Sequence, residues 1–130
     1  MANTDVQRAG HEPAPLPDDV RLTVDAALDK KSPRVTLLDL RGAGAFADFF
    51  VICTGTNVRQ VQAIADGVEA RLKAEGLRPA HVEGYDRAEW ILLDYFDFIV
   101  HVFTPDTSEF YSLDRLWGSA IRTEMAADGR

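Results

Sequence analysis

The chain of 130 residues contains one cysteine, Cys53, so no disulfide can form within it. Long apolar runs are missing too, and none approaches the roughly 20 residues that a membrane-spanning helix needs. The first residues, "MANTDVQRAGHEPAPLPDD", lack the apolar core of a secretory signal. These absences exclude a disulfide-stapled scaffold and argue against export and membrane insertion. We therefore expect a cytoplasmic protein.

Basic side chains are also in deficit. The chain has 14 Lys and Arg against 21 Asp and Glu, which gives a formal net charge of −7. Proteins that bind a phosphate backbone use lysine and arginine to displace its counterions. Direct nucleic-acid binding is therefore not expected, whereas a basic protein surface would be attracted and oriented by the opposite charge. Solubility alone would also account for the negative balance.

The composition of the chain is that of a globular domain, with 46% hydrophobic and 27% charged residues. Residues 1–17 are polar and contain three prolines, so they cannot bury enough apolar surface to fold, and a flexible tail is predicted there. Residues 18–125 are predicted to form a single domain, and residues 126–130 a frayed end.

Helical and strand patterns alternate along this domain. A helix is predicted to start at residue 18 or 19 and to stop before Pro33. The clearest helix begins at the cap residue Asn57, with which Gln60 can form a capping box, and ends at Gly76. Helical spacing of apolar residues returns between Phe110 and Ile121. Strands are expected at 34–42, 49–54, 81–83, 90–94 and 98–104. The order predicts an α/β fold, a mixed sheet of about five strands with flanking helices.

Three patterns could carry chemistry, and each also has a structural explanation. "CTGTN" precedes a helix N-terminus whose amides could hold an anion, but phosphate loops usually need more glycine than Gly55 alone. Asp94 and Asp97 could bind metal ions in a nucleotidyl transferase, yet residues three apart on a strand face opposite ways, and no "DxD" pair occurs. Cys53 and His101 could become neighbours, but both residue types are common in cores.

The pattern around Trp90 is stronger. On a strand over 90–94, Trp90, Leu92 and Asp94 share one face, while Ile91 and Leu93 point to a helix-covered core. Tryptophan is favoured at interface centres because it buries a large area at little entropic cost. Near it stand one arginine and five acids, Glu83, Asp86, Glu89, Asp94 and Asp97. An apolar anchor with an acidic rim suits a basic partner, and burial of Trp90 in the monomer core is the alternative.

Three segments in matching order and spacing resemble the ribosomal silencing factor family, also called Iojap-like proteins. They are "ADFFVICTGTNVRQVQAIADGVEARLK", "VEGYDRAEWILLDYFDFIVHVF" and "FYSLDRLW". The likeness runs from about residue 20 to residue 117, nearly all of the predicted domain. It implies a mixed α/β fold similar to the nucleotidyltransferase fold but lacking its catalytic acids, in agreement with the missing "DxD".

The resemblance also implies a function. Members of the family bind the large ribosomal subunit through its ribosomal protein L-fourteen, on the face where the small subunit docks. They thereby block subunit joining and reduce translation when nutrients are scarce, or act in subunit maturation. The mechanism is steric, without a reaction or a cofactor, and members can form homodimers. A nucleotide-binding or nucleotidyltransferase-like enzyme is the alternative from another class, and a protein that only self-associates is a third.

Matched residue by residue, the resemblance implies that Trp90 is the side chain that anchors this protein to its partner. It leaves open whether Tyr111 contacts the partner or the core. The predicted partner-binding residues are Trp90, Glu83, Asp94, Asp97, Leu92 and Tyr111. The chain departs from the family at Phe96, where "DYFD" replaces the usual "DYGD". If this position needs a positive φ, phenylalanine is strained there. Otherwise Phe96 adds apolar surface at the rim or marks a different turn.

Overall fold

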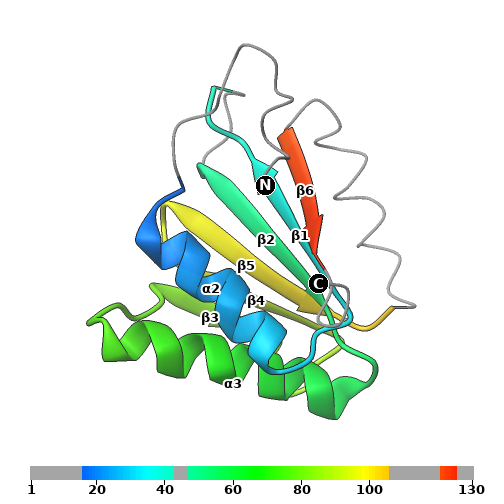
Figure 1. Cartoon of the computed structure of the whole chain (residues 1–130). Coiled ribbons are helices and arrows are strands. Elements are labelled where there is room, and N and C mark those ends of the chain that lie inside the picture. The colour runs from blue at the N-terminus through cyan, green and yellow to red at the C-terminus, as the bar shows by residue number, and fades with distance from the viewer. Residues whose placement is uncertain (1–15, 43–46, 106–120, 126–130) are drawn as a thin grey trace.

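The computed structural model describes residues 16–42, 47–105 and 121–125 (Figure 1). Within them lie two helices and a six-stranded sheet. The elements are α2 (Asp18–Asp29), β1 (Arg34–Asp39), β2 (Phe49–Thr54), α3 (Val58–Ala74), β3 (His81–Glu83), β4 (Trp90–Asp94), β5 (Phe98–Phe103) and β6 (Ile121–Met125). Residues 1–15 of the predicted tail, the predicted frayed end and Tyr111 lie outside the described residues, as does the helical spacing up to residue 120.

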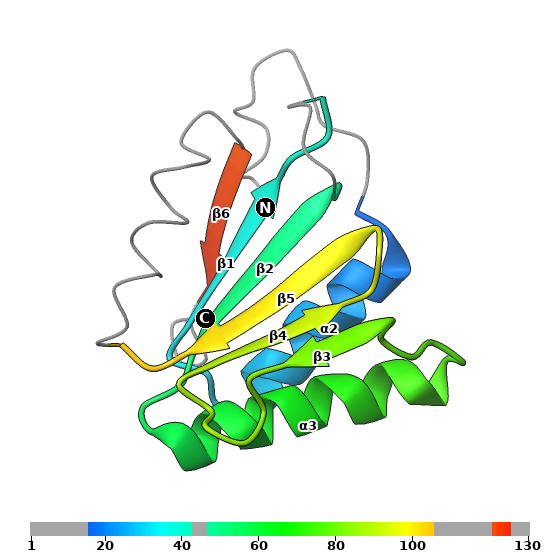
Figure 2. The same ribbon diagram turned by 180° about the vertical axis from the view of Figure 1, so that it is seen from behind.

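The strands are ordered β3-β4-β5-β2-β1-β6 across one mixed sheet. The central pair, β2 and β5, is parallel, and every other neighbouring pair is antiparallel. Helices α2 and α3 lie side by side on the same face of the sheet, and Figure 2 looks onto the opposite face. Neither of these two helices is long and apolar enough to cross a membrane.

The start of α3 is joined to the end of α2 by one side chain. Asn57 caps α3 as predicted, because its side-chain oxygen accepts from the Gln60 amide at 2.9 Å. Gln60 completes the cap at Thr56, the residue before Asn57, because the Gln60 side-chain oxygen accepts from the Thr56 backbone amide at 2.7 Å. The side-chain nitrogen of Gln60 donates to the carbonyls of Lys30 and Lys31 at 3.1 and 3.0 Å. The two helix ends are therefore held together.

Side chains are buried on both faces of the sheet. Ile91 and Leu93 join the cluster under the helices, whereas Trp90 and Leu92 pack against a second cluster on the opposite face. The alternation predicted for β4 is therefore confirmed. The second cluster consists of Leu38, Leu40, Ala47, Phe50, Ile52, Ile99 and Phe103. All six residues of β5 are buried, because this strand supplies side chains to both clusters.

The mixed α/β sheet and the five predicted strands are confirmed, and a sixth strand was missed. Helical spacing was predicted to continue through Ile121, but Ile121–Met125 pair with β1 as an antiparallel strand, from Asp39 opposite Ile121 to Val35 opposite Met125. The open edge of β1 offers backbone hydrogen bonds to this segment, and a local pattern of apolar residues cannot reveal such distant pairing. The likeness to a nucleotidyltransferase fold stays a prediction.

Candidate functional site

Four of the predicted partner-binding residues meet at one edge of the sheet. In the register of β3 and β4, Glu83 stands opposite Leu92. Directly opposed residues of antiparallel strands share a face, so Glu83 lies on the same side as Trp90, Leu92 and Asp94, away from the helices. Glu83 is exposed and the other three are partly buried. We call Glu83, Trp90, Leu92 and Asp94 the edge patch.

Trp90 is neither enclosed in the core nor free. Its indole packs edge-to-face against Phe103, with ring centroids 5.5 Å apart. Its Nε1–H donates to Nδ1 of His101 at 3.1 Å. Because Trp90 is partly buried, one part of the indole contacts its own chain and another part reaches solvent. The hydrogen bond therefore holds an incompletely covered aromatic ring in one orientation.

His101 is the fixed partner in this contact. It is 4% exposed, and burial lowers its pKa to about 4. At neutral pH the ring is therefore uncharged, and because Nδ1 accepts from Trp90, the proton lies on Nε2. Among the described residues this Nε2 has no hydrogen-bond partner. Protonation at Nδ1 would remove the acceptor and break the bond to the indole.

The segment between β3 and β4 passes close to the backbone of Trp90 at Gly84. Gly84 has a φ of 79°, and a Cβ on it would lie 2.1 Å from the Trp90 carbonyl oxygen. Only glycine therefore allows this approach. The segment is fastened to α3, because the Tyr85 hydroxyl donates to Asp66 at 2.9 Å and the Gln62 side chain donates to the Tyr85 carbonyl at 2.9 Å. Apart from the glycine in "VEGYD", no sequence signal pointed to these contacts.

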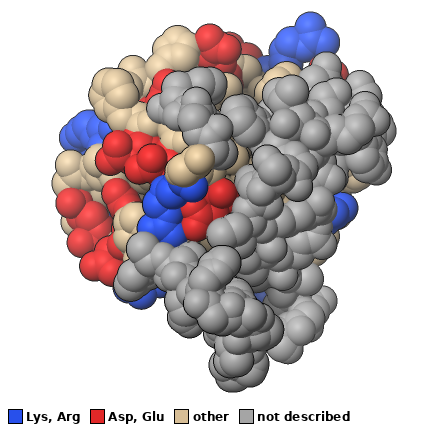
Figure 3. All heavy atoms as spheres, turned by 90° about the horizontal axis from the view of Figure 1, so that it is seen from above, with Lys and Arg blue, Asp and Glu red and all other residues tan. Residues whose placement is uncertain are grey.

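The acidic residues around the patch differ in their surroundings. Glu83 contacts His81 at 2.7 Å, both on β3. Asp94 accepts from the Phe96 amide at 2.8 Å and so supports the turn to β5. Asp97 is exposed in that turn, beyond the edge patch. Seen from above in Figure 3, the described surface carries acidic side chains with basic ones between them.

Phe96 has a φ of 74°. Of the alternatives left open for this turn, the left-handed backbone conformation is therefore the one formed, although the residue is phenylalanine.

The residues proposed for chemistry are not brought together. In β2 and β5, His101 stands opposite Ile52, so Cys53 projects to the helix-covered face and His101 to the other. Burial raises the pKa of the Cys53 thiol to about 12, which keeps it protonated and unreactive. No group of three His, Cys, Asp or Glu suited to a metal ion occurs in residues 16–42, 47–105 and 121–125.

The "CTGTN" turn uses its amides within the protein. The Gly55 amide donates to the Phe103 carbonyl at 2.9 Å, and the Thr56 amide donates to Gln60 at 2.7 Å. A Cβ at Gly55 would lie 2.7 Å from the Val61 side chain, so glycine here permits close packing against α3. The Gly55 and Thr56 amides are therefore already engaged and would not be free to hold a phosphate.

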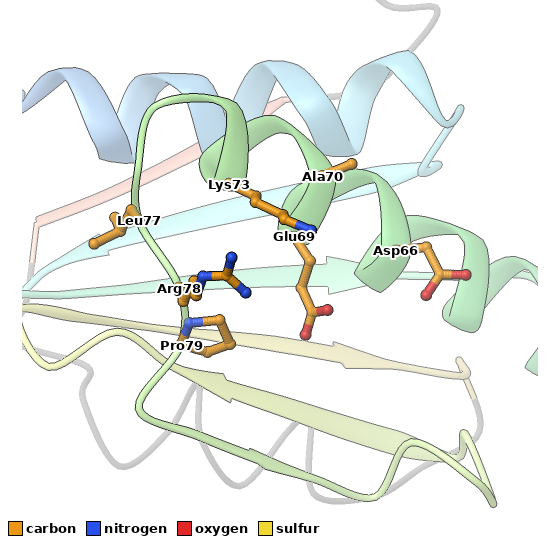
Figure 4. A pocket seen from close by; sticks show the side chains of 7 residues that line it. All are labelled: Asp66, Glu69, Ala70, Lys73, Leu77, Arg78 and Pro79. Carbon is orange, nitrogen blue, oxygen red and sulfur yellow. The ribbon is translucent and has the colours of Figure 1, made fainter.

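A groove of about 470 Å³ lies between α3 and the segment leading to β3 (Figure 4). Its charged lining has both signs, with Asp66 and Glu69 against Lys73 and Arg78. The Glu69 and Arg78 side chains extend into the same space. This mixed lining does not form the convergent set of donors that a nucleotide phosphate requires.

The burial of His101 predicts a specific acid sensitivity. Its pKa lies at about 4 in the folded protein against 6.5 for an exposed histidine, so the unfolded chain binds more protons between these values. The stability that neutral His101 supplies is complete above pH ~6.5 and is lost as the pH falls towards ~4. We expect His101→Phe to remove a pH dependence on the order of 2–3 kcal/mol from the free energy of unfolding, measured by urea titration across this window. His81→Gln, at an exposed histidine, should leave it intact. An identical pH dependence in His101→Phe and the natural chain would contradict the assignment.

Comparisons with known proteins agree with the resemblance. The family model described as "Ribosomal silencing factor during starvation" matches residues 13–129. The protein named ribosomal silencing factor RsfS of Halalkalibacterium halodurans is 41% identical over 106 residues, which cover 82% of this chain and 91% of that protein. A crystal structure of a Bacillus halodurans protein superposes with a TM-score of 0.72 at 39% identity, covering 77% of this chain and 93% of the other.

A more distant relative is mouse "Mitochondrial assembly of ribosomal large subunit protein 1", which is 24% identical over 102 residues. The match covers 76% of this chain but 45% of the mouse protein. The family model, in contrast, spans nearly the whole chain. On that match and the 41% identity to a bacterial RsfS, this chain belongs to the ribosomal silencing factor family.

Proposed function

We propose that this protein represses translation by binding the large ribosomal subunit and sterically preventing the small subunit from joining. One observation carries the proposal: a partly covered indole, Trp90, is held by a buried acceptor, His101, on the sheet face away from the helices. Glu83, which stands opposite Leu92, and Asp94, at the other end of β4, lie on the same face. Such a surface suits recognition by a macromolecule better than it suits a reaction.

The partner that fits this surface is a basic protein of the large subunit, and we infer that it is ribosomal protein L-fourteen. The net charge of −7 and the acids of the edge patch favour a positively charged partner. The family description and the name of the mouse relative, which refers to the large subunit, support a role at this particle. We place the protein in the cytoplasm, where bacterial ribosomes work, and treat a homodimer as a further proposed state.

The hydrogen bond to His101 explains why Trp90 would serve as an anchor. Binding usually costs free energy to immobilise side chains at the interface. The indole is already oriented by its Nε1–H bond and by the Phe103 ring, so less ordering is left for the partner to impose. Its uncovered part can then be buried on association. Tryptophans of this kind are frequent hot spots, and their truncation typically costs about 2 kcal/mol or more.

A role in assembly or maturation of the large subunit is the second candidate. It is favoured by the mouse relative, whose name refers to assembly of that subunit. Both roles begin with the same binding step. A nucleotide-binding enzyme is less well supported, because two amides of the "CTGTN" turn, those of Gly55 and Thr56, are already engaged. Cys53 and His101 also project to opposite faces of the sheet. We therefore propose a mechanism in which no bond is made or broken.

Replacing the indole by a carboxylate tests the anchor. We expect Trp90→Glu to weaken binding to isolated large subunits by about 30-fold or more. The substitution removes the apolar contact and places a carboxylate where the partner would have to strip it of water. The measurement is cosedimentation at several protein concentrations, with circular dichroism to confirm the fold. Val58→Glu is the matched control, since Val58 is 46% exposed at the start of α3, on the helix-covered side. Equal loss in both variants, or none in Trp90→Glu, would refute the anchor.

The acidic rim predicts a salt dependence. Attraction between exposed charges is screened as ionic strength rises, so affinity for the large subunit should fall between about 0.1 and 0.5 M monovalent salt at constant magnesium. The double variant Glu83→Gln, Asp94→Asn should bind more weakly at low salt and respond less steeply. Asparagine retains the side-chain oxygen that accepts from Phe96, so the turn is preserved. A salt response equal to that of the natural chain would show that these acids do not face the partner.

A further inference from the structure

Phe96 has two unfavourable features at once. Its side chain is 74% exposed, the largest fraction among the exposed large hydrophobic residues described. Its backbone has a φ of 74°, a conformation that residues other than glycine, asparagine and aspartate seldom adopt. A single exposed aromatic ring is ordinary. An exposed ring on a left-handed backbone is not, because glycine or asparagine would satisfy the turn at lower cost.

The turn itself does not need the ring. Asp94 accepts from the Phe96 amide at 2.8 Å, and the Tyr95 amide donates to the Phe98 carbonyl at 3.0 Å. The rings of Tyr95 and Phe98 stack with centroids 5.0 Å apart, and both residues are buried. Backbone contacts and these two flanking rings therefore hold the hairpin. The exposed ring of Phe96 takes part in none of these contacts.

The other exposed hydrophobic residues have local explanations. Tyr85 is 37% exposed, and its hydroxyl bonds to Asp66 on α3. Val82 is 38% exposed on the edge strand β3, and Val58 is 46% exposed in the first turn of α3. Val82 and Val58 have the backbone conformations of an ordinary strand and helix. Phe96 alone among these four combines exposure with a positive φ.

Acidic residues flank Phe96 in the sequence of the turn. Asp97 follows it in the turn and is exposed, and Asp94 precedes it. The Asp48 amide donates to the Asp97 carbonyl at 2.7 Å, which brings a third acid, exposed like Asp97, to the same end of the sheet. An aromatic face beside carboxylates suits an arginine, whose guanidinium stacks on the ring while its charge meets the acids.

This turn continues the edge patch. Asp94 belongs to both. From Trp90 to Asp94, β4 rises about 13 Å at roughly 3.3 Å per residue, and Phe96 follows two residues later in the turn. A protein interface of ordinary size, about 800 Å² on each partner, spans this length. One partner can therefore contact both Trp90 at the start of β4 and Phe96 in the turn that follows β4.

We propose that Phe96 is a second anchor for the basic partner that covers Trp90, and that an arginine side chain of that partner covers its ring. This inference rests on the proposed binding to the large subunit. It assigns to the β4–β5 turn a contact that the strand face alone does not supply, and it accounts for a residue that the fold disfavours at this position.

Replacing Phe96 separates binding from folding. Phe96→Gly and Phe96→Asn both introduce a residue that suits the left-handed turn. The melting temperatures of these two variants should therefore be the same as that of the natural chain or up to about 3 °C higher. Both should bind isolated large subunits about 10-fold more weakly, because each loses the ring. Phe96→Tyr, which retains an aromatic face, should stay within about 2-fold of the natural chain. Val58→Ala, at an exposed apolar residue outside the patch, should bind normally.

The outcomes distinguish this inference from the proposed function. If the natural chain binds and Trp90→Glu does not, but Phe96→Gly and Phe96→Asn bind like the natural chain, Phe96 is not an anchor and the proposed function stands. A clearly lower melting temperature in both variants would make the ring part of the fold and would also overturn the inference. If the natural chain fails to bind large subunits, both proposals are wrong.

Discussion

The complete burial of β5 between β2 and β4 is the constraint on which the site depends. Because this strand faces a core on both sides, a slip by one residue would move every side chain, including that of His101, into the opposite core. The same register sets Trp90 opposite Phe103 and Leu92 opposite His101. The indole therefore meets its hydrogen-bond acceptor as a consequence of how the core is paired.

That pairing leaves a surface suited to recognition. The Nε1–H group of the indole and part of its surface contact its own chain. The uncovered part lies on the face that Trp90 shares with Glu83 and Asp94. A wholly buried tryptophan would offer nothing to a partner, and a wholly free one would lose more conformational entropy on binding. Membership of the ribosomal silencing factor family is consistent with a protein that works through this surface.

Local signals in the sequence sufficed for much of this architecture. The cap at Asn57 and the alternation around Trp90 gave α3 and the two faces of β4 correctly, because both depend on residues close in sequence. Strand β6 was missed because its pairing with β1 joins segments some 85 residues apart. The contact between Trp90 and His101 was missed for a different reason: it depends on the register between the neighbouring strands β4 and β5, which no pattern within either strand reveals.

The central claim is that the large subunit covers the indole of Trp90. Hydroxyl-radical footprinting read by mass spectrometry tests it directly, since oxidation of a tryptophan reports its solvent access. The account predicts that the peptide containing Trp90 is oxidised in the free protein, protected when large subunits are added and unprotected with small subunits. Equal oxidation of Trp90 with and without large subunits, under conditions where the protein is bound, would contradict it.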